Sequence, residues 1–137
     1  MKIFMMIGLV VAIAFMPTKS QAHTEKPILY AIAFHADWCS SCKLLGPKVI
    51  KARGKSDLDS QNVLFIKLDL TDKTSRHQSS LVASAIGITD FYQSNAGKTG
   101  FVLLVNSATG VTLGKLTKDM DADQISSEIQ KQIKGLQ

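Results

Sequence analysis

A pair of cysteines stands where an apolar run meets an amphipathic segment, and this junction limits the possible folds more than any other feature. Cys39 and Cys42 are the only two cysteines of the 137-residue chain. The residues before them, Ile28–Phe34, are almost all apolar, which is typical of a strand buried on both faces of a sheet. Residues 41–55 after them carry apolar side chains at helical spacing. The pattern predicts a strand that delivers the cysteines to the first turn of a helix.

The remaining elements predict one small α/β domain. Val63–Asp69 is a second apolar strand, and a helix joining two such strands indicates a parallel βαβ unit. A shorter helix is expected over residues 79–86 and ends at a glycine. Phe101–Val105 and residues 111–116 flank a turn-rich connection, which predicts an antiparallel hairpin. With a helix from Asp121 onward, the expected order is β-α-β-α-β-β-α.

Local signals set the expected helix ends. Asp121 and Gln124 have the spacing of a capping box, and the helix they begin carries a stripe of isoleucines at positions 125, 129 and 133. In the 41–55 helix, Pro47 predicts a kink and Gly54 predicts the end.

The first 22 residues have the order of a secretory signal peptide. Lys2 precedes the apolar run Ile3–Met16, and Ser20 and Ala22 stand where an A-x-A-like cleavage site is expected. The apolar run is shorter than the ~20 residues that a membrane-spanning helix needs. We therefore expect an exported mature domain, residues 23–137, that begins at His23 and keeps no membrane anchor.

The charge of the chain does not indicate nucleic-acid binding. The formal net charge is +5, and removal of the signal peptide, which carries Lys2 and Lys19, lowers it to +3. These charges are spread along the sequence, whereas nucleic-acid-binding domains gather theirs on one face. Nucleic acid is therefore not an expected partner.

The position of the cysteines predicts thiol–disulfide chemistry. The positive end of a helix stabilises a thiolate, so Cys39 is the expected nucleophile. Cys42, one turn further on, is the expected resolving thiol that attacks the mixed disulfide and releases the substrate. No separate cofactor is expected, only a redox-active Cys39–Cys42 disulfide. The expected partners are proteins with reactive thiols or disulfides.

Other uses of the cysteines remain open at this stage. A structural zinc site needs further ligands, and only three histidines are present. A structural disulfide across so short a loop would stabilise little. A Cu(I) site that uses both cysteines and His35 is chemically admissible, so a copper-binding module or metallochaperone is the alternative function.

The segment Phe34–Lys43, with Gly46 and Pro47 after it, resembles the active site of the thioredoxin superfamily. Its Ala-Asp-Trp-Cys-x-x-Cys-Lys core, preceded by Lys26 and Pro27, is especially similar to periplasmic reductase domains of the DsbD type. The resemblance implies a thioredoxin-like fold, a four-stranded mixed sheet flanked by helices. It also implies a reductant in the periplasm that receives electrons from a membrane donor.

The resemblance further assigns supporting roles to residues around the cysteines. It implies that Trp38 packs beside the reactive sulfur, that Lys43 follows the motif, that Pro47 kinks the helix, and that Lys67 is a strand lysine near the site.

Two positions depart from the family pattern. Ala33 stands where thioredoxins keep a buried acid that assists proton transfer. The proline that the family places in the cis form before its third strand falls at about Gly100, and glycine does not favour a cis bond. Thr99 and Gly100 are nevertheless candidates for the substrate groove.

Residues 89–100 are rich in turn formers and predict an unusually long loop. One hypothesis is that this loop borders the site and that Phe91 and Tyr92 select a partner protein. The alternative is that both aromatic side chains pack onto the core.

Overall fold

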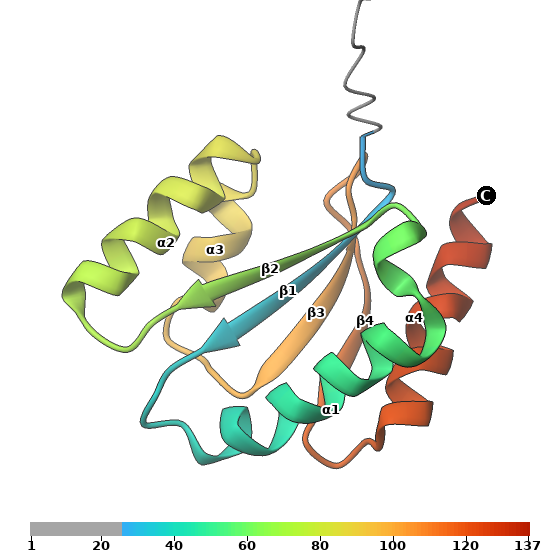
Figure 1. Ribbon diagram of the computed structural model, residues 1–137. Coiled ribbons are helices and arrows are strands. Elements are labelled where there is room, and N and C mark those ends of the chain that lie inside the picture. The colour runs from blue at the N-terminus through green and yellow to red at the C-terminus, as the bar shows by residue number, and fades with distance from the viewer. Residues whose placement is uncertain (1–25) are drawn as a thin grey trace, which may run out of the picture.

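The computed structural model describes residues 26–137, so the predicted signal peptide and its cleavage site lie outside the described residues. The elements in chain order are β1 (Leu29–His35), α1 (Ser40–Ser56), the short 3₁₀ helix η1 (Leu58–Ser60), β2 (Val63–Asp69), α2 (Lys73–Ala85), α3 (Thr89–Asn95), β3 (Phe101–Asn106), β4 (Thr112–Thr117) and α4 (Ala122–Leu136). Figure 1 shows this arrangement.

The sheet has four strands in the order β2-β1-β3-β4. β1 pairs in parallel with β2 and antiparallel with β3, and β3 and β4 form the expected antiparallel hairpin. The predicted four-stranded mixed sheet flanked by helices is thus confirmed. β1 lies between two strands and under helices on both sides, which explains why its sequence is apolar without alternation.

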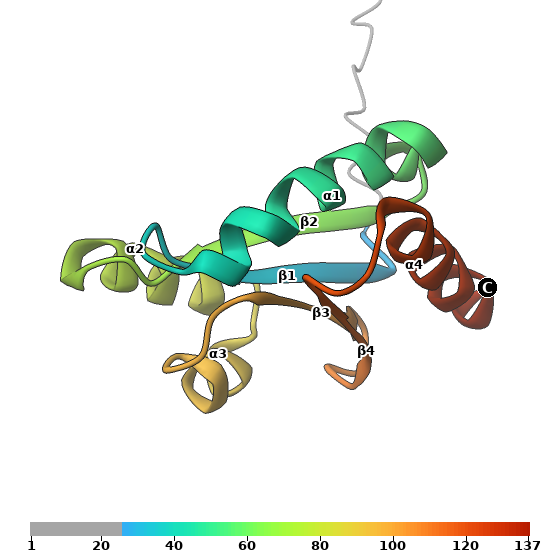
Figure 2. The same cartoon turned by 90° about the horizontal axis from the view of Figure 1, so that it is seen from below.

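Helices cover both faces of the sheet (Figure 2). α1 and α4 pack on one face over a core that includes Leu29, Leu104 and Ile129. α2 and α3 pack on the other face over a core that includes Phe34 and Leu103. Because side chains alternate along a strand, Ala31, Ala33 and His35 of β1 share the face under α1.

The capping box at the start of α4 is confirmed. The Asp121 carboxylate accepts hydrogen bonds from the backbone N–H groups of Asp123 and Gln124, and the Gln124 side chain accepts one from the Asp121 N–H. The expected stripe of isoleucines at 125, 129 and 133 is buried. No helix within residues 26–137 is long and apolar enough to cross a membrane.

The end of α1 differs from the expectation. The helix continues through Pro47 and past Gly54 to Ser56. It ends at Asp57, whose left-handed backbone (φ 46°) directs its N–H to the carbonyl of Arg53. An aspartate is among the few non-glycine residues that adopt this conformation with little cost, so the glycine was the wrong terminator.

Two further expectations were wrong. α2 begins at Lys73, six residues before the expected start, because Asp72 caps it through the Ser75 N–H although its first turns carry no apolar stripe. The expected loop 89–100 contains the helix α3. The turn-forming composition of this segment gives it a weak helix propensity. Its aromatic side chains pack on the sheet, and this packing stabilises the helix in spite of the composition.

Candidate active site

Cys39 and Cys42 lie at the start of α1 and are joined by a disulfide, with 5.3 Å between their Cα atoms. Cys39 is the N-cap residue, with an extended backbone at φ −83° and ψ 110°. Cys42 is in the first helical turn, and its backbone N–H donates to the Cys39 sulfur over 3.2 Å. The predicted junction of strand, cysteine pair and helix is therefore present.

The surroundings of the two sulfur atoms differ although both cysteines are only 7% exposed. The first turn of α1 has no acidic residue, so the positive helix end acts on the Cys39 sulfur without competition from a carboxylate. Cys42 Sγ faces inward and lies 3.7 Å from the carbonyl oxygen of Phe34. The geometry stabilises a thiolate at Cys39 rather than at Cys42.

Thr71 ties the loop before Cys39 to the end of β2. Its hydroxyl accepts a hydrogen bond of 3.0 Å from the Asp37 N–H, and its carbonyl accepts one of 3.1 Å from Trp38 Nε1. The indole is anchored by its nitrogen, yet Trp38 remains 61% exposed. Trp38 therefore forms an apolar surface next to the disulfide.

Gly100 lies directly against the cysteine pair. Its φ of 91° is in the region that favours glycine, and a Cβ built on it would lie 3.4 Å from Cys39 Sγ and only 2.8 Å from the Ser41 Cβ. Its N–H donates to the Phe34 carbonyl over 3.0 Å, and Thr99 before it is half-buried. No peptide bond in residues 26–137 is cis.

Lys67 and Asp69 lie on β2 beside the site. They pair in register with Ala33 and His35 of β1, and the Lys67 ammonium is 3.5 Å from the Asp69 carboxylate. Hydrogen bonds from the side chain and backbone N–H of Thr71, together with the charge of Lys67, hold the pKa of Asp69 below its usual value. Asp69 is therefore a carboxylate at neutral pH.

Asp69 and Thr71 were not among the residues predicted from the sequence. The signal that would have found them is the parallel pairing of Ile28–Phe34 with Val63–Asp69, because the carboxyl ends of parallel strands meet at one edge of the sheet.

The aromatic residues of α3 do not form an exposed rim. Tyr92 is buried, and its hydroxyl donates to the carbonyl of Arg76 over 3.0 Å. Phe91 packs against Phe34 with 6.0 Å between ring centroids. The expectation that both aromatic side chains pack onto the core is confirmed, with Tyr92 buried and Phe91 partly buried. A role of residues 89–100 in partner selection stays a prediction.

The other two supporting residues lie on the helix that carries Cys42. Lys43 and Pro47 are both exposed on α1. The Lys43 backbone N–H donates to the Cys39 carbonyl over 3.3 Å, and the roles of the two side chains stay predictions from the resemblance.

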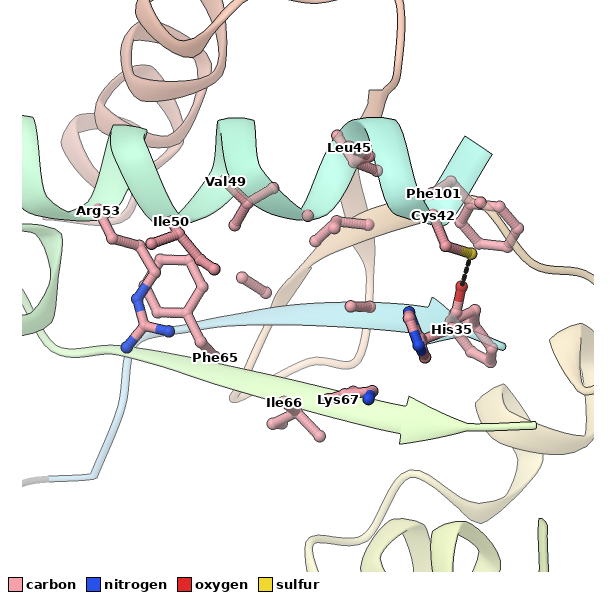
Figure 3. Close-up of a pocket in the computed structure, with 16 residues that line it drawn as sticks. His35, Cys42, Leu45, Val49, Ile50, Arg53, Phe65, Ile66, Lys67 and Phe101 are labelled. Carbon is pink, nitrogen blue, oxygen red and sulfur yellow. Dashed lines mark hydrogen bonds between the residues drawn. The ribbon is translucent and has the colours of Figure 1, made fainter. Parts of the chain in front are cut away.

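A cavity of about 310 Å³ lies behind Cys42, between α1 and the sheet (Figure 3). Small residues open it, because Ala31 and Ala33 of β1 leave the space under α1 unfilled. His35 and Lys67 line it near Cys42, and Arg53 lines its other end, where the guanidinium lies 4.2 Å from the centre of the Phe65 ring. The disulfide is thus backed by a largely apolar space with polar groups at its ends.

Comparison with known proteins agrees with this site. The family model described as Thioredoxin matches residues 15–99, which is more than half of the chain. The chain belongs to the thioredoxin family. The match includes the cysteine pair and ends just before β3, so the fold of the C-terminal part is established by the structure.

Individual relatives agree with the family. Mitochondrial thioredoxin of Bos taurus is 36% identical over 52 residues, which is 38% of this chain and 28% of the relative. The thioredoxin domain of a thiol-disulfide oxidoreductase from Bacteroides vulgatus superposes with a TM-score of 0.52 at 13% identity, over 79% of this chain and 81% of that one. Thioredoxin-2 of the malaria parasite superposes with a TM-score of 0.50 at 14% identity, over 75% of this chain and 82% of that one. The structural likenesses support the thioredoxin fold.

We predict that Gly100→Ala destabilises the protein by about 1–3 kcal/mol, because the added Cβ meets Ser41 and the backbone is unfavourable for alanine. Urea denaturation of the oxidised protein measures this change. Gly97→Ala is the matched control, since a Cβ there meets nothing within 4 Å. Equal stability of the two variants would contradict the close packing of Gly100 on the disulfide.

Proposed function

We propose that this chain is a thiol–disulfide oxidoreductase that acts on protein substrates through Cys39 and Cys42. The observation that carries the proposal is the disulfide at the N-terminus of α1, where the Cys39 sulfur accepts a hydrogen bond from the Cys42 N–H. In the reduced protein, the Cys39 thiolate attacks a substrate disulfide and releases one substrate thiolate. Cys42 then attacks Cys39 in the mixed disulfide, which releases the second substrate thiolate and restores the Cys39–Cys42 disulfide.

The surface around Cys39 supports a protein as the substrate. Trp38, next to Cys39 in the chain, offers an exposed apolar side chain, and Gly100 places backbone without a side chain against the Cys39 sulfur. Such a surface suits an extended polypeptide that carries a cysteine, because apolar contact and close backbone approach are both available.

We further propose that the protein is exported to a periplasm and works there as a reductant. The signal-peptide pattern of residues 1–22 supports export, and the similarity of the Ala-Asp-Trp-Cys-x-x-Cys-Lys segment to DsbD-type reductase domains supports reduction. A reductant in an oxidising compartment needs a supply of electrons, so a membrane donor that reduces the Cys39–Cys42 disulfide is part of the proposal.

Substitution of each cysteine tests the proposed activity. In an assay that follows reduction of insulin disulfides by dithiothreitol, the wild type should accelerate the reaction and Cys39→Ser should not. In a separate reaction without dithiothreitol, reduced Cys42→Ser should accumulate as a mixed disulfide with insulin, since its Cys39 can attack but the variant has no second thiol to resolve the product. Non-reducing electrophoresis measures this adduct.

The matched control in that assay is Ser41→Ala, which changes a neighbouring side chain and keeps both thiols. An inactive wild type that carries bound copper on purification would contradict the oxidoreductase proposal and favour the metal-binding alternative. An adduct in Cys39→Ser but not in Cys42→Ser would reverse the two roles.

Export is tested by expression of the full chain in a bacterium with a periplasm. We expect the protein in the periplasmic fraction, with a mass that corresponds to a chain beginning at His23. Val10→Arg, which interrupts the apolar run, should leave the uncleaved chain in the cytoplasm. Cytoplasmic, uncleaved wild type would contradict export.

A further inference from the structure

Cys42 must lose a proton during the resolving step, and its surroundings offer no direct exit. The residue is 7% exposed, and its sulfur faces the carbonyl oxygen of Phe34. A carbonyl accepts a hydrogen bond from a thiol but does not take the proton at neutral pH. Ala33, which lines the cavity behind the sulfur, has no titratable group. The proton must therefore leave through the cavity or through solvent that replaces the substrate.

His35 is the one imidazole that lines this cavity together with Cys42 (Figure 3). The other two titratable side chains on its wall, Arg53 and Lys67, are cations at neutral pH and have no lone pair to accept a proton. Histidine is the side chain that exchanges protons in this pH range. The ring is mostly buried, with its side chain 24% exposed, so it is more sheltered than a surface histidine.

The contact with Asp37 sets which nitrogen of the neutral His35 ring carries the hydrogen. His35 Nε2 lies 3.1 Å from Asp37 Oδ1, and an ionised carboxylate only accepts hydrogen bonds. Nε2 therefore carries the hydrogen of the neutral ring, and Nδ1 keeps a lone pair that can accept a proton. When the ring is protonated, the same contact becomes an ion pair.

Charged side chains from the loop after β1 and from β2 lie around His35. His35, Asp37 and Asp69 each place one nitrogen or oxygen within 4.8 Å of the others. Lys67, on β2, opposes them but is itself 3.5 Å from Asp69. The titratable side chains that α1 contributes to the cavity wall are Cys42 and, further from His35, Arg53. The residues of β3 that line the cavity are uncharged.

We propose that His35 accepts the proton of Cys42 during the resolving step, which deepens the proposed oxidoreductase function and rests on it. The proton passes from the Cys42 sulfur to His35 Nδ1 through water in the cavity, whose volume of about 310 Å³ exceeds the ~30 Å³ that one water occupies. The Cys42 thiolate attacks Cys39 Sγ, the new S–S bond forms, and the bond from Cys39 to the substrate breaks. The departing substrate thiolate carries the electron pair away, and the imidazolium later returns its proton to solvent.

The experiment measures the resolving step by itself. Reduced protein is mixed with an equimolar aromatic disulfide whose thiolate is coloured, so the first phase reports attack by Cys39 and the second reports resolution by Cys42. We expect His35→Gln to slow the second phase by about 100-fold at neutral pH, the lower end of the range for a lost general base, and to leave the first phase unchanged. The difference should shrink as the pH rises, because hydroxide then takes the Cys42 proton without assistance.

Three variants separate this role from a structural one. Asp37→Asn keeps the ring but weakens its orientation, so we expect a smaller slowing of the second phase. His77→Gln removes an exposed histidine of α2 and should change neither phase. Cys42→Ser should show the first phase only, which identifies the second.

The outcomes distinguish this proposal from the function on which it rests. If the wild type shows no second phase, the oxidoreductase proposal fails and the role of His35 falls with it. If the wild type resolves normally and His35→Gln resolves equally fast at neutral pH, only the role of His35 is overturned. An equal slowing at every pH would also overturn it, because that result indicates a displaced sulfur rather than a lost proton acceptor.

Discussion

The hydrogen bond from the Cys42 N–H to the Cys39 sulfur is the contact on which the site depends. It exists because β1 ends where α1 begins, so that one cysteine caps the helix and the other lies in its first turn. β1 is fixed in turn by pairing with β2 on one side and β3 on the other. The buried strand therefore positions the reactive sulfur, and the helix end sets its charge preference.

The Phe34 carbonyl connects the three parts that surround the disulfide. This single oxygen, at the end of β1, accepts the Gly100 N–H from the approach to β3 and faces Cys42 Sγ from α1. A proline at position 100 would have no N–H to donate, and its φ cannot reach the 91° of Gly100. The chain thus closes this side of the site with a glycine that contributes a hydrogen bond and allows close contact with Cys39.

The sequence predicted those parts of the fold whose signals are local. β1, β2 and the capping box at Asp121 follow from apolar runs and a short motif, and the structure has them where they were expected. α3 was missed because its helix is stabilised by Tyr92 and Phe91 packing on distant residues, which no local pattern encodes. The same limit applies to the site.

The cysteine pair is visible in the sequence, whereas the partners that adjoin it come from other strands. Thr71 and Asp69 reach the site through the parallel pairing of β1 with β2, and the cavity results from small residues whose spacing in the chain gives no hint of a shared wall.

The central claim, a reversible Cys39–Cys42 couple that serves as a reductant, is tested most directly by its reduction potential. The fluorescence of Trp38, the only tryptophan of the chain, can follow the couple in dithiothreitol redox buffers. A reversible transition near −270 mV, the approximate value for thioredoxin, is the predicted result. A transition near −120 mV would contradict the reducing role, and the absence of any transition would contradict the couple itself.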